Sequence, residues 1–194
     1  TVPPTEFTPA KLDGRDAVVL LDVADLDHSQ VKALEVFVAR GGGLVIAAGG
    51  LAKPDFYNGL MNRDGRGRAP ASMAPDRPVT SAEASVLEPE SLSVPWIQRF
   101  KPGTGIDLST VRLTTWRKLT PVAAPPIDEK ASPAPGEATV SDPVVAARLK
   151  SGDPWLVTRR YGDGQVALLA TPLDAEWSTL PSKNDFVPFV HELL

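Results

Sequence analysis

Residues 16–50 have the sequence DAVVLLDVADLDHSQVKALEVFVARGGGLVIAAGG, with two apolar runs on either side of a helical pattern. The first run, Ala17–Asp22, is rich in valine and leucine and is typical of a strand that is covered on both faces of a parallel sheet. The run Leu44–Ala48 predicts a second strand of this kind. Two such strands joined by a helix form a β-α-β unit with a right-handed crossover.

The segment between these strands carries the signals of a capped helix. Asp27 can accept a hydrogen bond from the first turn, and Gln30 can return one, as in a capping box. Leu26 can pack against Val31 as a hydrophobic staple, and Gly41 can end the helix in a left-handed turn. The stripe that we expect to face the sheet contains Val31, Leu34 and Val38.

The C-terminal part of the chain is also regularly patterned. Trp155–Tyr161 predicts a strand, residues 162–164 predict a glycine-rich hairpin turn, and Gln165–Ala170 predicts the returning strand. Apolar residues at helical spacing after Asp185 predict a final helix, whose first turn tolerates Pro188 because it has no intrahelical donor to lose. On that helix His191 and Glu192 lie off the apolar stripe, which favours a water-facing position.

Residues 51–152 differ from both ends, because they hold most of the 20 prolines. We expect a long, partly irregular insertion, with Pro121–Pro135 as a mobile excursion without apolar periodicity. Within it, Val111–Trp116 predicts a strand, and Asp142–Lys150 predicts a short helix after a Ser or Asp cap.

The whole pattern predicts a single α/β domain over residues 1–194. We expect a three-layer, flavodoxin- or Rossmann-like fold with a mainly parallel sheet, a C-terminal antiparallel hairpin and the long insertion. Because the sequence begins at Thr1 rather than at Met, we expect a piece excised from a larger chain. No apolar run approaches the roughly 20 residues of a membrane span, so we expect no direct membrane insertion of this segment.

The composition argues against several classes of protein. The net charge of −4 disfavours a nucleic-acid partner, which needs a cationic face. The chain has no cysteine and two histidines, which removes thiolate chemistry and makes a multi-histidine metal site implausible. The acidic cluster of Asp22, Asp25, Asp27 and His28 matches no calcium loop, so we expect no metal and no cofactor.

Two stretches together resemble the class I glutamine amidotransferase-like superfamily: residues 16–50, quoted above, and residues 152–181, GDPWLVTRRYGDGQVALLATPLDAEWSTLP. The resemblance is to its inactive-looking branch. This branch includes trehalose-utilisation-type domains and the amidotransferase-like domains of large bacterial membrane proteins that also carry a von Willebrand A domain. It implies a membrane-associated bacterial parent protein, with the side of the membrane undetermined, and other domains of that parent or a separate protein as partners.

The resemblance also implies where catalytic residues would stand. Active members carry a cysteine nucleophile in a Gly-Ile-Cys-x-Gly elbow, and a His-Pro-Glu strand end supplies the base. In this sequence the elbow falls on residues 47–50 (Ala-Ala-Gly-Gly), with Ala48 at the nucleophile position, and Thr171 stands where the base would be. We therefore expect that the chain has no amidotransferase activity. We expect it to serve protein interaction or ligand sensing instead.

The carboxyl ends of the predicted strands define a candidate ligand crevice, since ligands of open α/β sheets bind there. Its candidate residues are Asp22, Ala48, Gly49, Gly50, Thr171 and Asp174. The favoured interpretation of the two glycines is structural, because a tight strand exit needs residues without a Cβ. Two alternatives stay open: binding of a carbohydrate or small metabolite, and a hydrolase or transferase that uses carboxylates such as Asp22 and Asp174.

A group of arginines is the remaining polar feature. Arg159 precedes Arg160 and Tyr161, and the segment 63–68 carries three more arginines at positions 63, 66 and 68. Together they could bind an anion. Opposite charges are interspersed nearby, so a solvated surface is the favoured interpretation.

Overall fold

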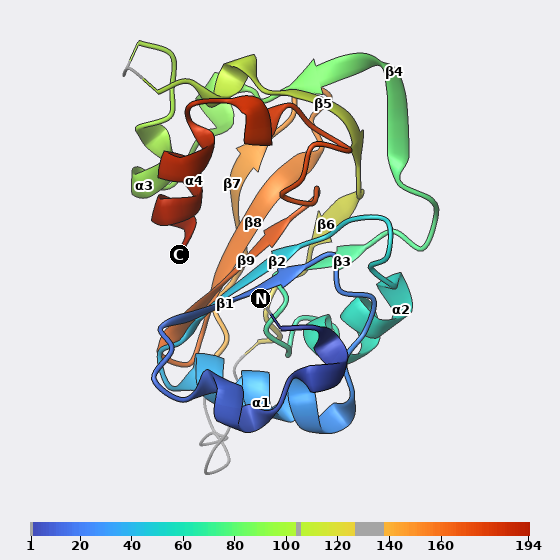
Figure 1. The fold of residues 1–194 in the computed structure, drawn as a ribbon, viewed down its shortest axis with the longest axis vertical. Helices are drawn as coiled ribbons and strands as arrows, with labels where there is room; N and C mark the ends of the chain where they lie inside the picture. The colour runs from blue at the N-terminus through green and yellow to red at the C-terminus, as the bar shows by residue number, and fades with distance from the viewer. Residues whose placement is uncertain (1, 104–105, 127–137) are drawn as a thin grey trace.

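The computed structural model describes residues 2–103, 106–126 and 138–194 (Figure 1). Its centre is a five-stranded sheet with the strand order β1-β2-β9-β8-β7. The strands are β1 (Ala17–Leu21), β2 (Gly43–Ala47), β9 (Gly164–Leu169), β8 (Pro154–Tyr161) and β7 (Val144–Arg148). The α/β class that the sequence predicts is therefore confirmed.

The β-α-β unit forms as predicted. β1 and β2 pair in parallel, and helix α1 (His28–Ala39) connects them. The Asp27 carboxylate accepts a bond from the N–H of Gln30 at 2.9 Å, and the Gln30 side chain accepts one from the N–H of Asp27 at 3.0 Å. This reciprocal pair is the predicted capping box. Gly41 has φ 106° at the helix end, and the predicted stripe is buried.

The other half of the sheet is antiparallel. β2 pairs with β9 in parallel, whereas β9–β8 and β8–β7 are antiparallel. The hairpin turn between β8 and β9 places Gly162 at φ 60°, as the glycine-rich turn predicts. The expectation of a mainly parallel sheet was wrong, because two of the four strand pairs are antiparallel.

Strand β7 lies where the sequence predicts the short helix Asp142–Lys150, so that prediction was wrong. Alanines in this segment favour a helix by propensity, but Val144 and Val145 are β-branched and pair with β8. Pairing buries Ala146 and Ala147 completely, which a solvent-facing helix would not do. Tertiary contact overrides a weak local preference here.

The proline-rich region contributes β7 to the main sheet and two small antiparallel pairs. These are β3 (Ala71–Met73) with β6 (Leu119–Pro121), and β4 (Val79–Val86) with β5 (Arg112–Trp116). The strand predicted at 111–116 is thus confirmed as β5. Of the expected mobile excursion at 121–135, residues 127–135 lie outside the described residues.

Short helical segments connect these strands. They are α2 (Pro54–Phe56), a π-helical turn (Tyr57–Asn62) and α3 (Pro95–Gln98). The 3₁₀ turns span Pro4–Glu6, Pro9–Leu12, Pro89–Ser91, Leu108–Thr110 and Leu180–Ser182.

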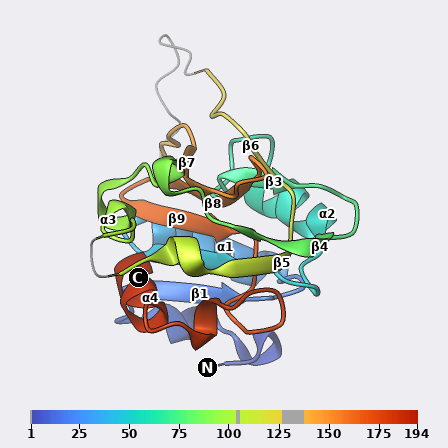
Figure 2. The same cartoon turned by 90° about the horizontal axis from the view of Figure 1, so that it is seen from above.

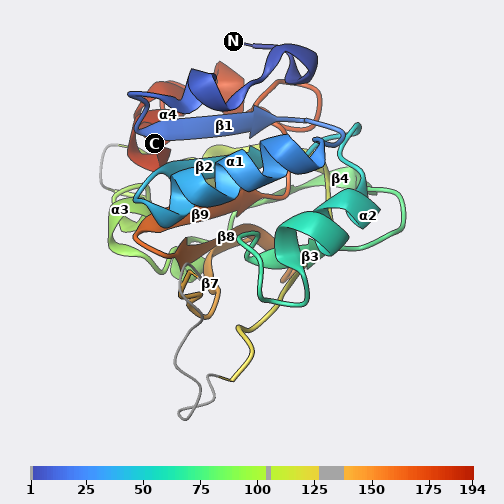
Figure 3. The ribbon, with the colours of Figure 1, turned by 90° about the horizontal axis from the view of Figure 1, so that it is seen from below.

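Helix α1 lies on one side of the sheet and helix α4 (Phe186–Leu193) on the other (Figure 1). Phe189 anchors α4, with its ring centroid 5.5 Å from that of Trp155 on β8 and 6.0 Å from that of Phe100. Seen from above and from below, β1 is the outermost strand of the sheet (Figures 2 and 3). Among the described residues, no helix has the length and apolar composition that a bilayer crossing requires.

Candidate functional site

Asp22 directly follows β1, and its carboxylate holds the loop that follows β2. Its Oδ1 accepts hydrogen bonds from the backbone N–H groups of Gly49 at 2.9 Å, Leu51 at 3.0 Å and Ala52 at 3.1 Å. Asp22 has φ 45°, a left-handed conformation that Asp adopts more readily than most residues. One carboxylate therefore satisfies three backbone donors of residues 48–52, which we call the strand-end loop.

Arg117 holds the same loop through its carbonyl groups. It follows β5 and is 6% exposed. Its Nε and Nη2 donate to the carbonyl of Gly49 at 3.0 and 2.9 Å, and Nη2 also donates to those of Gly50 at 3.1 Å and Ala52 at 3.0 Å. Burial lowers the pKa of Arg117, and the nearby Asp22 carboxylate acts in the opposite direction. No sequence motif singles out Arg117, because its loop partners lie about 65 positions away.

The two glycines of the loop differ in what they require. A Cβ on Gly49 would lie 2.5 Å from Cγ of Asp22, so this position admits no side chain without displacing the carboxylate. A Cβ on Gly50 would meet nothing closer than Trp177 at 3.9 Å. The predicted geometric need for glycine is therefore confirmed at Gly49 and wrong at Gly50.

Ala48 and Thr171 stand where the amidotransferase resemblance puts the nucleophile and the base, and both are completely buried. The N–H of Ala48 donates to the carbonyl of Leu169 on β9 at 3.2 Å. The Thr171 hydroxyl accepts a bond from Nε1 of Trp155 at 3.1 Å. Parallel pairing brings these strand ends together as expected, but neither side chain reaches solvent.

Asp22 and Asp174 line one open groove of about 580 Å³ between β1 and α4. Asp174 is exposed, and its Oδ1 accepts the N–H of Glu176 at 2.9 Å. Among the bonds of the described residues, none joins the two carboxyl groups. Most other lining side chains are apolar; they include Val19, Leu21, Leu173, Phe186, Val187 and Leu194. Two of the six candidate crevice residues therefore face a groove, and its character is apolar.

His191 and Glu192 on α4 have different surroundings. His191 is exposed, as predicted, and it is one of the residues that line the groove. Glu192 is not simply solvated, because its carboxylate pairs with Arg99 next to α3. This ion pair joins two elements that are distant in sequence, which helical spacing alone does not reveal.

The arginines form a cluster around Glu35 on α1. Tyr161 donates to Oε1 of Glu35 at 2.8 Å, Arg63 donates to the same atom at 3.1 Å, and Nη1 of Arg68 lies 3.7 Å from Oε2. Burial alone would raise the pKa of Glu35, but these partners outweigh it and lower the pKa. Burial lowers the pKa of Arg68 to about 10, although the negative charge of Glu35 acts to raise it. Burial and the bond to Glu35 raise the pKa of Tyr161 to about 12.

Arg159 is buried and holds the neighbouring loop. Its Nη1 donates to the carbonyls of Gly65 at 3.0 Å and Gly67 at 3.1 Å, and its Nη2 donates to that of Val122 at 2.6 Å. The favoured interpretation of a solvated arginine surface was wrong for Arg68 and Arg159, which are 0% and 3% exposed. Carbonyl groups accept the Nη donors of Arg159, and Glu35 lies beside Arg63 and Arg68, whereas the Nε atoms of these three arginines have no hydrogen-bond partner among the described residues.

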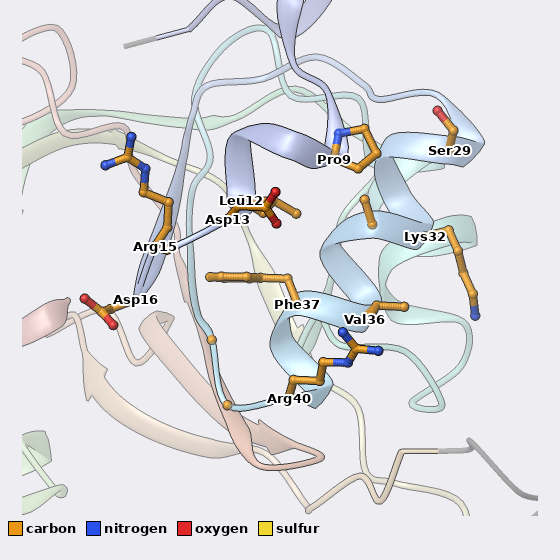
Figure 4. A pocket seen from close by; sticks show the side chains of 14 residues that line it. Pro9, Leu12, Asp13, Arg15, Asp16, Ser29, Lys32, Val36, Phe37 and Arg40 are labelled. Carbon is orange, nitrogen blue, oxygen red and sulfur yellow. The ribbon is translucent and has the colours of Figure 1, made fainter.

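A larger hollow, of about 810 Å³, lies between α1 and the segment that precedes β1. Figure 4 shows Phe37 pointing from α1 toward the segment that carries Asp13 and Arg15. This hollow lies at the amino ends of β1 and β2, opposite the strand-end loop, and contains none of the candidate crevice residues. Among the described residues, no group of three or more His, Asp or Glu side chains could hold a metal ion.

No protein-family model and no curated protein matches this chain. The fold does resemble solved structures. The cytoplasmic protein STM3548 from Salmonella typhimurium aligns over 99% of this chain and 74% of its own, with TM-score 0.68 and 16% identity. STM1381 from Salmonella typhimurium LT2 aligns over 96% and 71%, with TM-score 0.62 and 20% identity. The N-terminal domain named mmIFT52 aligns over 96% and 81%, with TM-score 0.53 and 16% identity. At these identities the likeness concerns the fold alone.

Proposed function

We propose that this chain is a non-catalytic domain of the class I glutamine amidotransferase-like superfamily that serves protein interaction, with a flavodoxin-like three-layer arrangement. The observation that carries the proposal is that the Asp22 carboxylate already accepts the backbone N–H groups of the strand-end loop. In an acyl-transfer enzyme, backbone N–H groups next to the nucleophile stabilise the oxyanion. Here the N–H of Gly49, which follows Ala48, is bonded to the Asp22 carboxylate, and a substrate oxyanion beside that carboxylate would be repelled.

The second catalytic position supports the same proposal. A general base must lie within hydrogen-bond reach of the nucleophile and of water or substrate. Thr171 is completely buried and its hydroxyl is bonded to Trp155. A threonine also lacks a titratable group in the neutral range.

The context of the proposal comes from the resemblance of the two end stretches. The partners would be other domains of a membrane-associated bacterial parent protein or a separate protein. Ligand sensing is a related role, which the groove between β1 and α4 would serve.

Ammonia release from glutamine tests the absence of catalysis. We expect the purified chain to release ammonia at the rate of a buffer blank, with an active amidotransferase domain as the positive control. Release above the blank that disappears in Asp22→Asn or Thr171→Val would contradict the proposal. Release that persists in both variants would indicate a contaminating enzyme, and a fresh purification would then have to return it to the blank.

Binding of a carbohydrate or small metabolite is the second candidate function, and the exposed Asp174 in the groove favours it. A thermal-shift screen with sugars, nucleotides and amino acids distinguishes it from protein interaction. A ligand at about 100 times its dissociation constant stabilises the folded state by about 2.7 kcal/mol. A shift of that size that is lost in Asp174→Ala would favour small-molecule binding or carboxylate chemistry over protein interaction.

A further inference from the structure

Strand β1 leaves one edge of the sheet unpaired. The N–H of Gly43 donates to the carbonyl of Asp16 at 2.8 Å, and the N–H of Asp22 donates to that of Ala47 at 2.9 Å. In a parallel ladder, alternate residues of a strand direct their N–H and C=O groups to the same neighbour. Asp16 and Asp22 therefore face β2 together with the even-numbered residues between them. The odd-numbered residues, Ala17, Val19 and Leu21, direct their backbone groups away from the sheet.

Nothing in the described chain pairs with these outward groups. No hydrogen bond of the described residues outside the β1–β2 ladder involves the backbone of Ala17, Val19 or Leu21. The N-terminal segment is tied to α1 instead, because the Gln30 side chain donates to the carbonyls of Pro4 at 2.8 Å and Phe7 at 3.0 Å. The sequence of β1, AVVLL, contains no charge, proline or glycine that would discourage pairing.

At the opposite edge of the sheet, the outward backbone groups of β7 are hydrogen-bonded by another segment of the chain. Outside β7, the N–H of Glu88 donates to the carbonyl of Arg148 at 2.9 Å, and the N–H of Ser93 donates to that of Ala146 at 3.1 Å. The Ser91 hydroxyl accepts the N–H of Arg148 at 2.8 Å. The segment around residues 88–93 therefore closes the β7 edge, whereas no segment of the described chain forms hydrogen bonds to the outward backbone groups of β1.

The apolar groove adjoins the open edge. Val19 and Leu21 direct their backbone groups outward, and their side chains line the groove beside α4. Seven large apolar side chains of the described chain are exposed, and three of them line this groove: Leu21 at 53%, Val187 at 73% and Leu194 at 56%. Backbone donors and acceptors thus lie next to an apolar surface that can receive alternate side chains.

We propose that β1 binds an extended strand of a partner protein, which extends the sheet and places its alternate apolar side chains in the groove against α4. This inference deepens the proposed interaction function and rests on it. An added strand matches the outward N–H and C=O groups, which a helix cannot do because its own backbone groups are already bonded. A strand opposite the 5 residues of β1 spans roughly 17 Å and places two or three side chains in the groove.

Charge at the carboxyl end of β1 specifies one residue of the partner. Asp174 lines the groove with Asp22 and is exposed, and the exposed Glu176 follows it two positions later; neither carboxylate forms an ion pair with a described residue. Asp22 already faces Arg117. The two exposed carboxylates favour a lysine or arginine at the end of the partner strand that lies beside Asp174.

Displayed peptide libraries test the proposal on the intact chain. One library places apolar residues at every second position, another at helical spacing, and a third scrambles the same residues; all carry a terminal lysine or arginine. We expect the alternating library to be enriched, and its selected peptides to bind Leu21→Lys and Val187→Lys at least tenfold more weakly. Val144→Lys on β7 is the matched control, because Val144 is also exposed at 46%. Binding to this control should stay within twofold.

Several outcomes would overturn the strand proposal. Two of them concern the selection: enrichment of none of the libraries, or enrichment of the helical library. Two concern the selected peptide: binding to Leu21→Lys as strong as to the unchanged chain, or unchanged binding after methylation of its alternate backbone nitrogens. A dimer of the chain that Leu21→Lys dissociates would assign the edge to a second copy and would also overturn it. Enrichment of the helical library would leave the interaction function standing, whereas glutamine hydrolysis would refute that function independently.

Amide hydrogen exchange supplies a second readout that does not depend on the variants folding. In the free chain we expect the amides of Val19 and Leu21 to exchange at least tenfold faster than those of Val18 and Leu20, which are bonded to β2. The selected alternating peptide should slow the exchange of Val19 and Leu21. Slow exchange in the free chain, or no change with the bound peptide, contradicts an open edge that receives a strand.

Discussion

At the scale of single residues, Asp22 and Arg117 determine the state of the strand-end loop. Asp22 binds the N–H groups of this loop, and Arg117 binds its carbonyl groups. The loop is therefore held by side chains that come from distant parts of the sequence. Asp22 stands out in the sequence as a carboxylate after an apolar strand, but Arg117 does not.

Gly49→Ala is expected to destabilise the chain, because the new Cβ would lie 2.5 Å from the Asp22 carboxyl carbon. Relieving that contact means moving a side chain that holds three backbone donors, so we expect a loss of about 1–3 kcal/mol in the free energy of unfolding. Urea unfolding measures it. The matched variant is Gly50→Ala, which has open space and should change stability by less than about 0.5 kcal/mol. Equal effects of the two variants would disprove the steric argument.

Asp22→Ala removes the acceptor of three backbone N–H groups. We expect a loss of about 1–3 kcal/mol, since donors left without a partner cost more than the bond itself contributes. The control is Asp76→Ala, because Asp76 is exposed. Urea unfolding of both variants should separate them, and a stability of Asp22→Ala equal to that of the control would mean that water replaces the carboxylate at no cost.

At the scale of elements, local sequence signals are sufficient to predict α1, whereas β7 depends on pairing with distant segments. The capping box and apolar stripe of α1 lie within about a dozen residues of each other, and a helix follows from them directly. β7 has no such local signal, and its alanines favour a helix. Its strand conformation depends on pairing with β8 on one edge and on the segment around residues 88–93 on the other.

Phe189→Ala tests how α4 is attached to the sheet. Phe189 is completely buried, and its ring lies near those of Trp96, Phe100 and Trp155. Its truncation should leave a cavity and lower the free energy of unfolding by about 3–5 kcal/mol. Val187 lies on the same helix and is 73% exposed, so Val187→Ala should change stability by less than about 0.5 kcal/mol. Thermal unfolding compares the pair. Similar melting temperatures for the two variants would show that α4 contributes little to the core.

At the scale of the whole molecule, Glu35 connects three regions. It lies on α1, and its partners Arg63, Arg68 and Tyr161 lie in the loop after the π-helical turn and on β8. The arginines and Tyr161 stand out in the sequence as a group, whereas Glu35 does not, because a glutamate on a helix is usually solvated. Only the packing of α1 beside this loop brings the carboxylate among the arginines.

Glu35→Gln should change the pH dependence of stability. The folded-state pKa of Glu35 is lowered, so its contribution is present above the ordinary carboxyl range and is lost as pH falls through the folded value. The variant should therefore be less stable than the natural chain at about pH 7, and the difference should shrink toward about pH 3. Urea unfolding at both pH values measures this. Glu176→Gln, at an exposed glutamate, is the control, and a difference for Glu35→Gln that does not vary with pH would refute the argument.

By itself the sequence determines the β-α-β unit, the β8–β9 hairpin, the final helix and the absence of a cysteine or histidine at the strand ends. The secondary-structure elements follow from backbone preferences and apolar spacing within short windows, and the missing cysteine and histidine follow from the composition. Only the tertiary structure decides that β7 joins the sheet, that Arg117 and Asp22 share one loop, that Glu35 lies among arginines and that β1 has an open edge. Each of these depends on which distant segments become neighbours, because hydrogen-bond and charge partners are assigned by the packing of the whole chain.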